Sequence, residues 1–112
     1  MELMAGVGRN YNTLKYFFSN IEMIEQSPEM YKKIPTEVTI HKKLIQDFEW
    51  PIKEYDCVVG VWCFCYLNES DMLKQTTFIK ESLKTGGHFV LFETVVGFME
   101  KQVPRFYHHM EQ

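Results

Sequence analysis

The chain has 112 residues, of which 46% are hydrophobic and 24% are charged, and its formal net charge is −3 at pH 7. This length allows one domain at most, and the scattered lysines and arginines give no nucleic-acid footprint. No apolar run approaches the roughly 18 residues that span a bilayer, and no secretory signal opens the chain. We therefore expect an intracellular protein without nucleic-acid or membrane partners.

The cysteines are clustered in one apolar run, at Cys57, Cys63 and Cys65. An odd count in one run does not indicate a disulfide framework, and a Cys-x-Cys pair alone cannot complete a four-ligand zinc site. We therefore expect buried strand thiols in a reducing compartment, and no metal.

A glycine turn, Gly6–Arg9, stands almost at the start of the chain, with "MELMA" before it. Turns of this kind follow the first strand of an α/β domain, yet only Met1, Glu2 and Leu3 precede the loop. Three residues reach about 10 Å, whereas a usual strand covers roughly 17–20 Å. We therefore expect the first strand to be missing, so that the chain is a fragment or takes a strand from a partner chain.

The remaining sequence alternates apolar runs with helical patterns. The expected elements are a helix within 11–20, a strand at 21–25, a short helix from Ser27-Pro28, a strand at 36–41, a buried strand opening the run 55–67, a helix from about 68 to 85 and a strand at 88–95. Gly86 and Gly87 are expected to cap the last helix. Strands separated by helices predict βαβ units and a mostly parallel sheet.

Ligands of such sheets bind beyond the carboxyl ends of the strands, and several polar and aromatic residues fall there. Gly6 and Gly8 let the backbone approach a ligand. Glu25 follows Gly6 by nineteen positions, a spacing typical of an acidic residue that accepts hydrogen bonds from a ribose. Trp62 and Tyr66 end the long apolar run, where aromatic side chains are usually core but can wall a cation pocket.

Two further residues of this edge belong to "LIQDFEW" at 44–50. Gln46 or Asp47 could meet an adenine edge, and Ile45 could pack on its face. An ordinary loop is the alternative interpretation of this stretch.

A dinucleotide oxidoreductase is disfavoured, because its fingerprint needs a third glycine where this chain has Tyr11. The turn with Glu2 before it, together with "EYDCVV" and "SLKTGGHFVLFE", instead resembles S-adenosylmethionine-dependent methyltransferases. "ELMAGVGR", "IEMIEQSPEM", "LIQDF", "YDCVVGVWCFCYL" and "ESLKTGGHFVLFETV" are similar, in order, to five motifs of the alpha N-terminal protein methyltransferase family. The resemblance runs from residue 2 to about 95.

The resemblance implies S-adenosyl-L-methionine as cofactor and assigns a role to each matching position. Gly6, Gly8 and Arg9 would hold the methionine end of the cofactor, and Glu25 and Gln26 would bind the ribose. Ile45 and Gln46 would contact the adenine. Trp62, the aromatic residue of the fourth strand, would lie beside the methyl group. Tyr66 and Glu93 would complete the catalytic set. Glu93 is the better candidate base, because the reference pKa of tyrosine is near 10.

Departures from the family pattern are equally specific. The first turn glycine is Met4, the strand-four glutamine is Val61, and the family's glycine-histidine pair is Cys65-Tyr66. No counterpart of the family's last two strands follows residue 95. The resemblance thus implies a partial Rossmann-like class I methyltransferase domain over 1–95, without its first and last two strands, and a C-terminal tail over 96–112.

Two functions follow as expectations. The first is transfer of a methyl group to the N-terminal α-amine of a protein, in the cytoplasm, the nucleus or both. The alternative is a catalytically decayed remnant that acts as a protein-interaction or structural subunit, favoured by Met4, by the lost histidine and by the missing strands.

Overall fold

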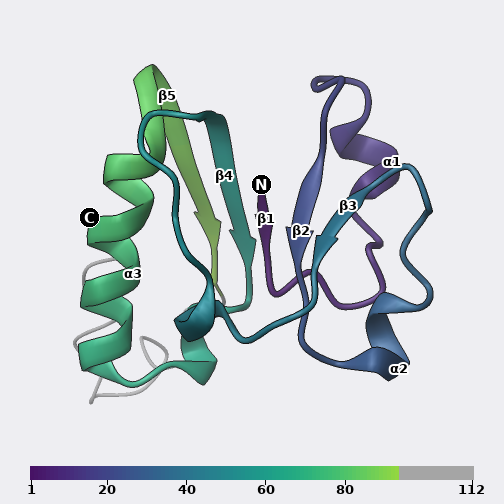
Figure 1. The fold of residues 1–112 in the computed structure, drawn as a ribbon, viewed down its shortest axis with the longest axis horizontal. Coiled ribbons are helices and arrows are strands. Elements are labelled where there is room, and N and C mark those ends of the chain that lie inside the picture. Colours follow the sequence, from purple (N-terminus) through teal and green to yellow (C-terminus); the bar gives the residue numbers. More distant parts are fainter. Residues whose placement is uncertain (94–112) are drawn as a thin grey trace.

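The computed structural model describes residues 1–93. Five strands form one sheet in the order β3-β2-β1-β4-β5, and every neighbouring pair is parallel (Figure 1). The strands are β1 (Glu2–Leu3), β2 (Glu22–Ile24), β3 (Thr39–His41), β4 (Tyr55–Val61) and β5 (Leu83–Phe92). The expected α/β fold with a mostly parallel sheet is confirmed.

Helical segments connect the strands. They are α1 (Tyr11–Leu14), α2 (Pro28–Tyr31), α3 (Glu69–Ser82) and two 3-10 turns, η1 (Ile45–Asp47) and η2 (Phe64–Tyr66). Pro28 opens α2, as expected for a residue that tolerates the first helical position. None of the helices in residues 1–93 is long and apolar enough to cross a membrane.

The first strand is present as a two-residue strand, so the expectation that it is missing needs correction. Glu2 pairs with both neighbours, Met23 of β2 and Val59 of β4, and Leu3 is fully buried. The length argument failed because β1 pairs with only one residue of β2, Met23, and with two residues near the carboxyl end of β4, Val59 and Gly60. The length argument still holds for the amino half of the sheet, because β1 does not extend that far.

Gly86 and Gly87 do not cap α3, contrary to expectation. The helix ends at Ser82, whose hydroxyl donates to the carbonyl of Ile79 at 2.7 Å, and both glycines lie inside β5. A Cβ on Gly87 would stand 3.0–3.1 Å from backbone oxygens of Lys84, Tyr55 and Asp56. The glycine pair therefore allows the backbones of β4 and β5 to approach closely where their pairing begins with an irregular register.

Two apolar clusters cover the two faces of the sheet. The larger is built around Leu3, Ile24, Val58 and Ile79 of α3. The smaller joins Met23, Ile34 and Val38, with Tyr11, Leu14 and Tyr31 packed against it. The alternating residues of β2, Met23 and Ile24, thus face opposite clusters, as the pleat of a strand requires.

The cysteines follow the expectation only in part. Cys63 is buried, Cys57 is half-buried and Cys65 is exposed, and all three are free thiols. Cys65 is exposed because the chain leaves the sheet after β4 and continues as η2. The expected tail over 96–112 lies outside the described residues.

Candidate functional site at the carboxyl edge of the sheet

The sequence-predicted residues follow the carboxyl ends of all five strands. Because the strands are parallel, their following segments gather along one edge, at the bottom of Figure 1. In sheet order these segments are η1 after β3, Glu25 after β2, the glycine turn after β1, Trp62 and η2 after β4, and Glu93 after β5. The fold thus assembles one site from residues spread over the chain.

The glycine turn takes left-handed backbone at three positions: φ is 46° at Met4, 64° at Gly6 and 77° at Gly8. A Cβ on Gly8 would lie 3.2 Å from Ile34, so Gly8 packs the turn closely against the fold. A Cβ on Gly6 would meet no atom within 4 Å. The Gly6 side of the turn is therefore open to a ligand.

Glu25 holds the turn from the neighbouring strand. One carboxylate oxygen accepts from the Gly6 amide at 2.7 Å and the other from the Ser27 amide at 2.9 Å. The residue is only 8% exposed. Glu25 therefore joins the end of β2 to the turn after β1. The nineteen-residue spacing between Gly6 and Glu25 had suggested that these two segments meet.

Glu2 lies buried beside the turn, at 2% exposure. Oε2 accepts from the Asn10 side chain at 2.8 Å, whereas Oε1 has no hydrogen-bond partner among the described residues. Burial raises the pKa of this carboxyl, against the opposing effects of Asn10 and the chain's ammonium group. A donor or cation close to Oε1 would stabilise the ionised form.

Sequence reasoning missed Asn10. The signal was present, since an asparagine directly before a helix is a preferred N-cap. Asn10 is the N-cap of α1, but its side chain makes no cap bond. Its side-chain amide nitrogen donates to Glu2.

The η1 segment places its two candidate residues differently. Ile45 is 2% exposed and belongs to the larger core cluster, so its side chain anchors the segment. Gln46 is exposed and donates to Asp71 at 3.4 Å. Gln26 and Arg9 are also exposed at this edge.

The far side of the site carries the three predicted catalytic residues. Trp62 takes left-handed backbone at φ 52°, and its side chain is 57% exposed. Tyr66 is 77% exposed. Glu93 is half-buried and accepts from the Phe64 amide at 2.8 Å, so its carboxylate is fixed against η2.

Glu93 also affects the neighbouring thiols. Burial first, and the charge of Glu93 second, raise the pKa of Cys63 to about 12. The same two causes raise the pKa of the exposed Cys65. These cysteines are therefore protonated near neutral pH, and no group of three potential metal-ligating side chains exists among residues 1–93.

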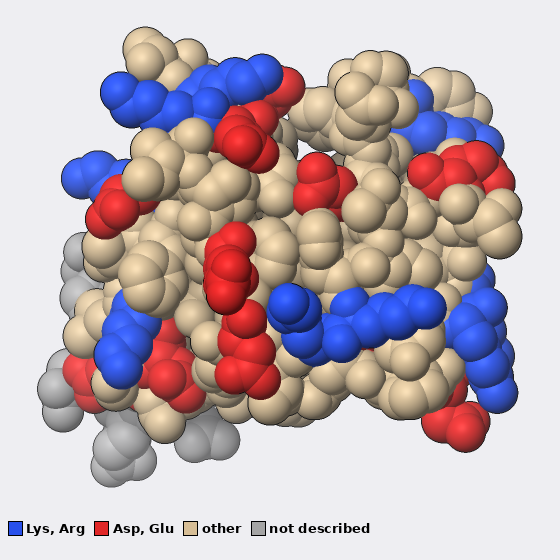
Figure 2. Space-filling model, viewed as in Figure 1, with Lys and Arg blue, Asp and Glu red and all other residues tan. Residues whose placement is uncertain are grey.

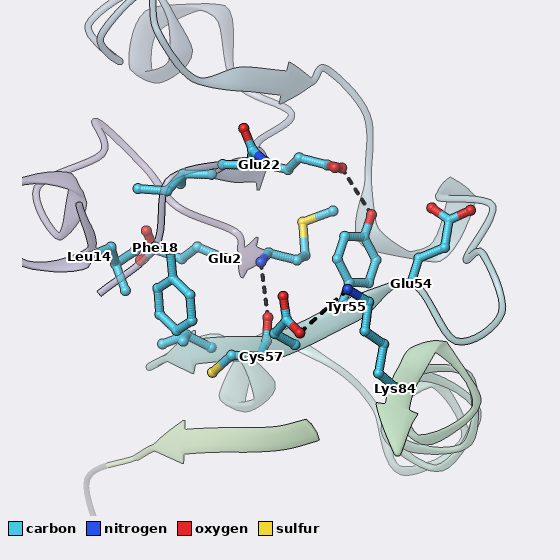
Figure 3. A pocket seen from close by; sticks show the side chains of 13 residues that line it. Glu2, Leu14, Phe18, Glu22, Glu54, Tyr55, Cys57 and Lys84 are labelled. Carbon is cyan, nitrogen blue, oxygen red and sulfur yellow. Dashed lines mark hydrogen bonds and ion pairs between the residues drawn. The ribbon is translucent and has the colours of Figure 1, made fainter. Parts of the chain in front are cut away.

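A cavity of about 220 Å³ lies at the opposite edge of the sheet (Figure 3). Its walls come from the amino ends of β2 and β4, with Met1 between them and Lys84 beside them. Glu2 also lines this cavity. We assign the candidate site to the carboxyl edge because the turn, Glu25 and Glu2 meet there.

No family model and no curated protein matches this chain. Solved structures do. A methyltransferase from Mesorhizobium loti is 18% identical to this chain, with a TM-score of 0.71. The match covers 80% of this chain and 44% of that protein. A methyltransferase from Leishmania major is 22% identical with a TM-score of 0.74, covering 79% and 39%. Both depend on S-adenosylmethionine.

A third similar structure is phosphoethanolamine N-methyltransferase 1 from Haemonchus contortus, bound to phosphoethanolamine and S-adenosylhomocysteine. It is 16% identical with a TM-score of 0.79, covering 85% of this chain and 22% of its own. The chain thus spans less than half the length of these three proteins. At these identities the likeness defines the fold, which is that of class I S-adenosylmethionine-dependent methyltransferases.

Proposed function

We propose that this chain is the cofactor-binding part of an S-adenosyl-L-methionine-dependent methyltransferase that acts on the N-terminal α-amine of proteins. The observation that carries the proposal is the link between Glu25 and the Gly6 amide. It joins an acidic residue after the second strand to an open, left-handed turn after the first. This is the arrangement in which a nucleoside can lie between a carboxylate and a backbone turn.

The buried groups of the site suit this cofactor. Oε1 of Glu2 is an acceptor without a partner in the described residues, and an ammonium group such as that of a methionine moiety would satisfy it. Gly6 leaves the space in front of the turn open. When bound, the cofactor would supply an electrophilic methyl group on a sulfonium.

The chain's own residues would then orient and deprotonate the amine. Trp62 and Tyr66 expose aromatic surface between the turn and Glu93, which can attract a cationic amine before it loses its proton. Glu93 is the proposed proton acceptor. Its bond from the Phe64 amide holds the carboxylate in one orientation, and positioning of this kind contributes much of the rate of such a transfer.

The proposal predicts a specific effect of Glu25. Removal of a charged acceptor costs about 1.5–3 kcal/mol, so Glu25→Ala should weaken S-adenosylmethionine binding by about 10- to 150-fold. Isothermal titration measures it, with circular dichroism to verify the fold. Glu29→Ala, an exposed residue of α2, is the matched control and should bind like the parent.

The substrate is tested separately. A peptide with a free N-terminus should accept a methyl group from labelled cofactor, and the same peptide with an acetylated N-terminus should not. Equal labelling of both peptides would place the methyl group on a side chain and contradict the proposed substrate. No binding heat from the folded parent chain would contradict any role for the cofactor.

The alternative, a decayed remnant that serves as an interaction subunit, rests on Met4 and Tyr66. Met4 stands in the left-handed region, where the family pattern has glycine, and Tyr66 replaces the family's histidine. A decayed remnant would bind the cofactor weakly and would transfer no methyl group even as Met4→Gly. Labelling of the free-amine peptide by either form would rule this alternative out.

A further inference from the structure

The 3-10 turn η1 is held by the core on one side and presents Gln46 on the other. Ile45 is 2% exposed and packs in the larger core cluster. The Asp47 amide donates to the Leu44 carbonyl at 3.0 Å, which closes the turn. The exposed side chain of Gln46 therefore projects from a fixed backbone at the carboxyl edge of the sheet.

The start of α3 supplies a partner for Gln46. The side-chain nitrogen Nε2 of Gln46 donates to Oδ2 of Asp71 at 3.4 Å. Asp71 is half-buried, and its backbone amide donates to the side chain of Asn68, the N-cap of α3, at 2.8 Å. The contact thus joins η1 to the well-defined first turn of the longest helix in residues 1–93.

The amide of Gln46 is asymmetric, and Asp71 determines which way it points. A carboxylate only accepts hydrogen bonds, whereas a glutamine amide has two N–H donors on its nitrogen and an acceptor on its oxygen. The reverse orientation would bring Oε1 of Gln46 against the Asp71 carboxylate, which is acceptor against acceptor. Figure 2 shows further acidic side chains around η1 and the lower end of α3, and these favour the same orientation. Oε1 and the second N–H of Gln46 remain for a ligand.

Adenine and hypoxanthine differ at the edge that such an amide recognises. Adenine presents its 6-amino group as a donor beside a ring nitrogen that accepts, and the oxygen and N–H of a glutamine amide complement this pair. Hypoxanthine carries an oxygen in place of the amino group, so the amide would have to turn over to bind it. The turned amide would direct Oε1 at Asp71. An amide fixed by Asp71 therefore matches adenine and opposes hypoxanthine.

The strand order brings the base of a bound nucleoside to this amide. Glu25, the proposed partner of the ribose, follows β2, and its backbone amide donates to the carbonyl of His41 at the end of β3 at 3.1 Å. The turn η1 begins at Ile45, four residues after His41. A ribose on Glu25, with the methionine end at the glycine turn after β1, would therefore direct its base toward η1, on the far side of β2 from the turn.

We propose that Asp71 is a positioning residue that makes the site specific for adenine over hypoxanthine, by fixing the amide orientation of Gln46. Gln46 contacts the base, and Asp71 acts through Gln46 without touching the ligand. This inference rests on the proposed binding of S-adenosylmethionine and adds to it a specificity-determining residue that lies on α3, outside the glycine turn and the strand ends.

The test compares the affinities of S-adenosylhomocysteine and S-inosylhomocysteine, which differ at the 6-position of the base, by isothermal titration. The parent chain should bind the adenosyl ligand about tenfold more tightly. Asp71→Asn keeps the size of the side chain but can offer a donor or an acceptor, so Gln46 can turn over and most of this preference should be lost. Glu69→Gln removes an exposed acid from the same first turn of α3 and should keep the parent preference.

A double variant separates positioning from a structural effect. Gln46→Ala should reduce the preference as far as Asp71→Asn does, and the two changes together should reduce it no further. The proposal is overturned if Asp71→Asn weakens both ligands alike, if it still changes the preference in the Gln46→Ala background, or if Asp47→Asn removes the preference in its place. Equal binding of both ligands by the parent would overturn this inference alone. A folded parent that binds neither ligand would overturn the proposed function with it.

Discussion

Met4 combines two opposing effects at one position. Its backbone lies in the left-handed region at φ 46°, where a non-glycine residue is strained, yet its side chain packs against the larger core cluster. Glycine at this position removes the strain and clears the approach to the turn, but it also removes the packing. The net effect on stability is therefore smaller than either contribution.

We expect Met4→Gly to tighten S-adenosylmethionine binding and to change the free energy of unfolding by less than about 1 kcal/mol. Isothermal titration and urea denaturation measure the two quantities. Ala5, the next residue, is half-buried and has a regular backbone, so Ala5→Gly controls for added flexibility. Unchanged or weaker binding by Met4→Gly would mean that the turn does not contact the cofactor as proposed.

Glu2 is a buried acid whose pKa is raised above the ordinary value of 4.5, mainly by desolvation. The folded state therefore holds this proton to a higher pH than the unfolded state does. The contribution of Glu2 to stability is largest below the unfolded pKa and falls as the pH rises through the folded pKa. Above that pH the protein carries a buried carboxylate with one unpartnered oxygen.

Glu2→Gln removes this titration. We expect the variant to gain about 1 kcal/mol of stability at neutral pH and to lose the fall in stability above pH 4.5 that belongs to this group. Urea denaturation of both proteins across a pH series measures the difference. A parent and variant whose stabilities run parallel with pH would show that Glu2 does not titrate in this way.

At the scale of the elements, α3 is the one long helix of the described chain, and its start is well defined. Asn68 is the N-cap, and its side-chain oxygen accepts from the Asp71 amide at 2.8 Å. Asp71 and Glu69 also lie in the first turn, where negative charge is favourable.

Asn68→Ala should therefore lower the free energy of unfolding by about 1 kcal/mol, whereas Asn68→Asp should keep most of it. Thermal and urea unfolding with a circular-dichroism readout measure both variants. Ser70→Ala, two residues further along the chain, is the control. If Asn68→Ala costs no more stability than Ser70→Ala, the cap does not stabilise α3.

The sequence predicted elements well where one periodic pattern decided them. The apolar run gave β4, and the helical pattern from about 68 to 85 gave α3, which covers Glu69–Ser82. β1 was missed because two residues carry no periodicity, and their strand geometry comes from the two neighbours that flank them. Gly86 and Gly87 were misread because a glycine pair after a helix also suits a close approach between strands.

The candidate site, too, could be predicted from the sequence only in part. The spacing between Gly6 and Glu25 pointed to two segments that do meet, because parallel topology fixes where loops end. The burial of Ile45, the exposure of Trp62 and the bond between Asn10 and Glu2 depend on packing around each side chain. Residue type alone does not determine such packing.

For the whole molecule, the narrow β1 has a mechanical consequence. Within residues 1–93 the sheet consists of a β2–β3 part and a β4–β5 part that β1 joins (Figure 1). Glu2 pairs with both parts, at Met23 and Val59, whereas Leu3 pairs with Gly60 of β4. Three buried residues form the smaller cluster beside β2 and β3. The larger cluster holds α3 and β4 together, and of β2 and β3 only Ile24 is among its buried residues. The two parts therefore differ in stability and share few backbone bonds.

We expect the β2–β3 part to open at a lower free energy than the β4–β5 part, because fewer apolar contacts hold it. Native-state hydrogen exchange in increasing urea measures this residue by residue. The amides of Met23 and Ile40, which pair with each other, should lose protection at lower urea than those of Val58 and Phe89 in the β4–β5 ladder. Leu3→Ala should widen the gap between the two parts, since it removes a fully buried side chain from the strand that joins them. If all four amides instead follow one urea dependence in the parent, two residues of β1 are enough to make the sheet a single cooperative unit.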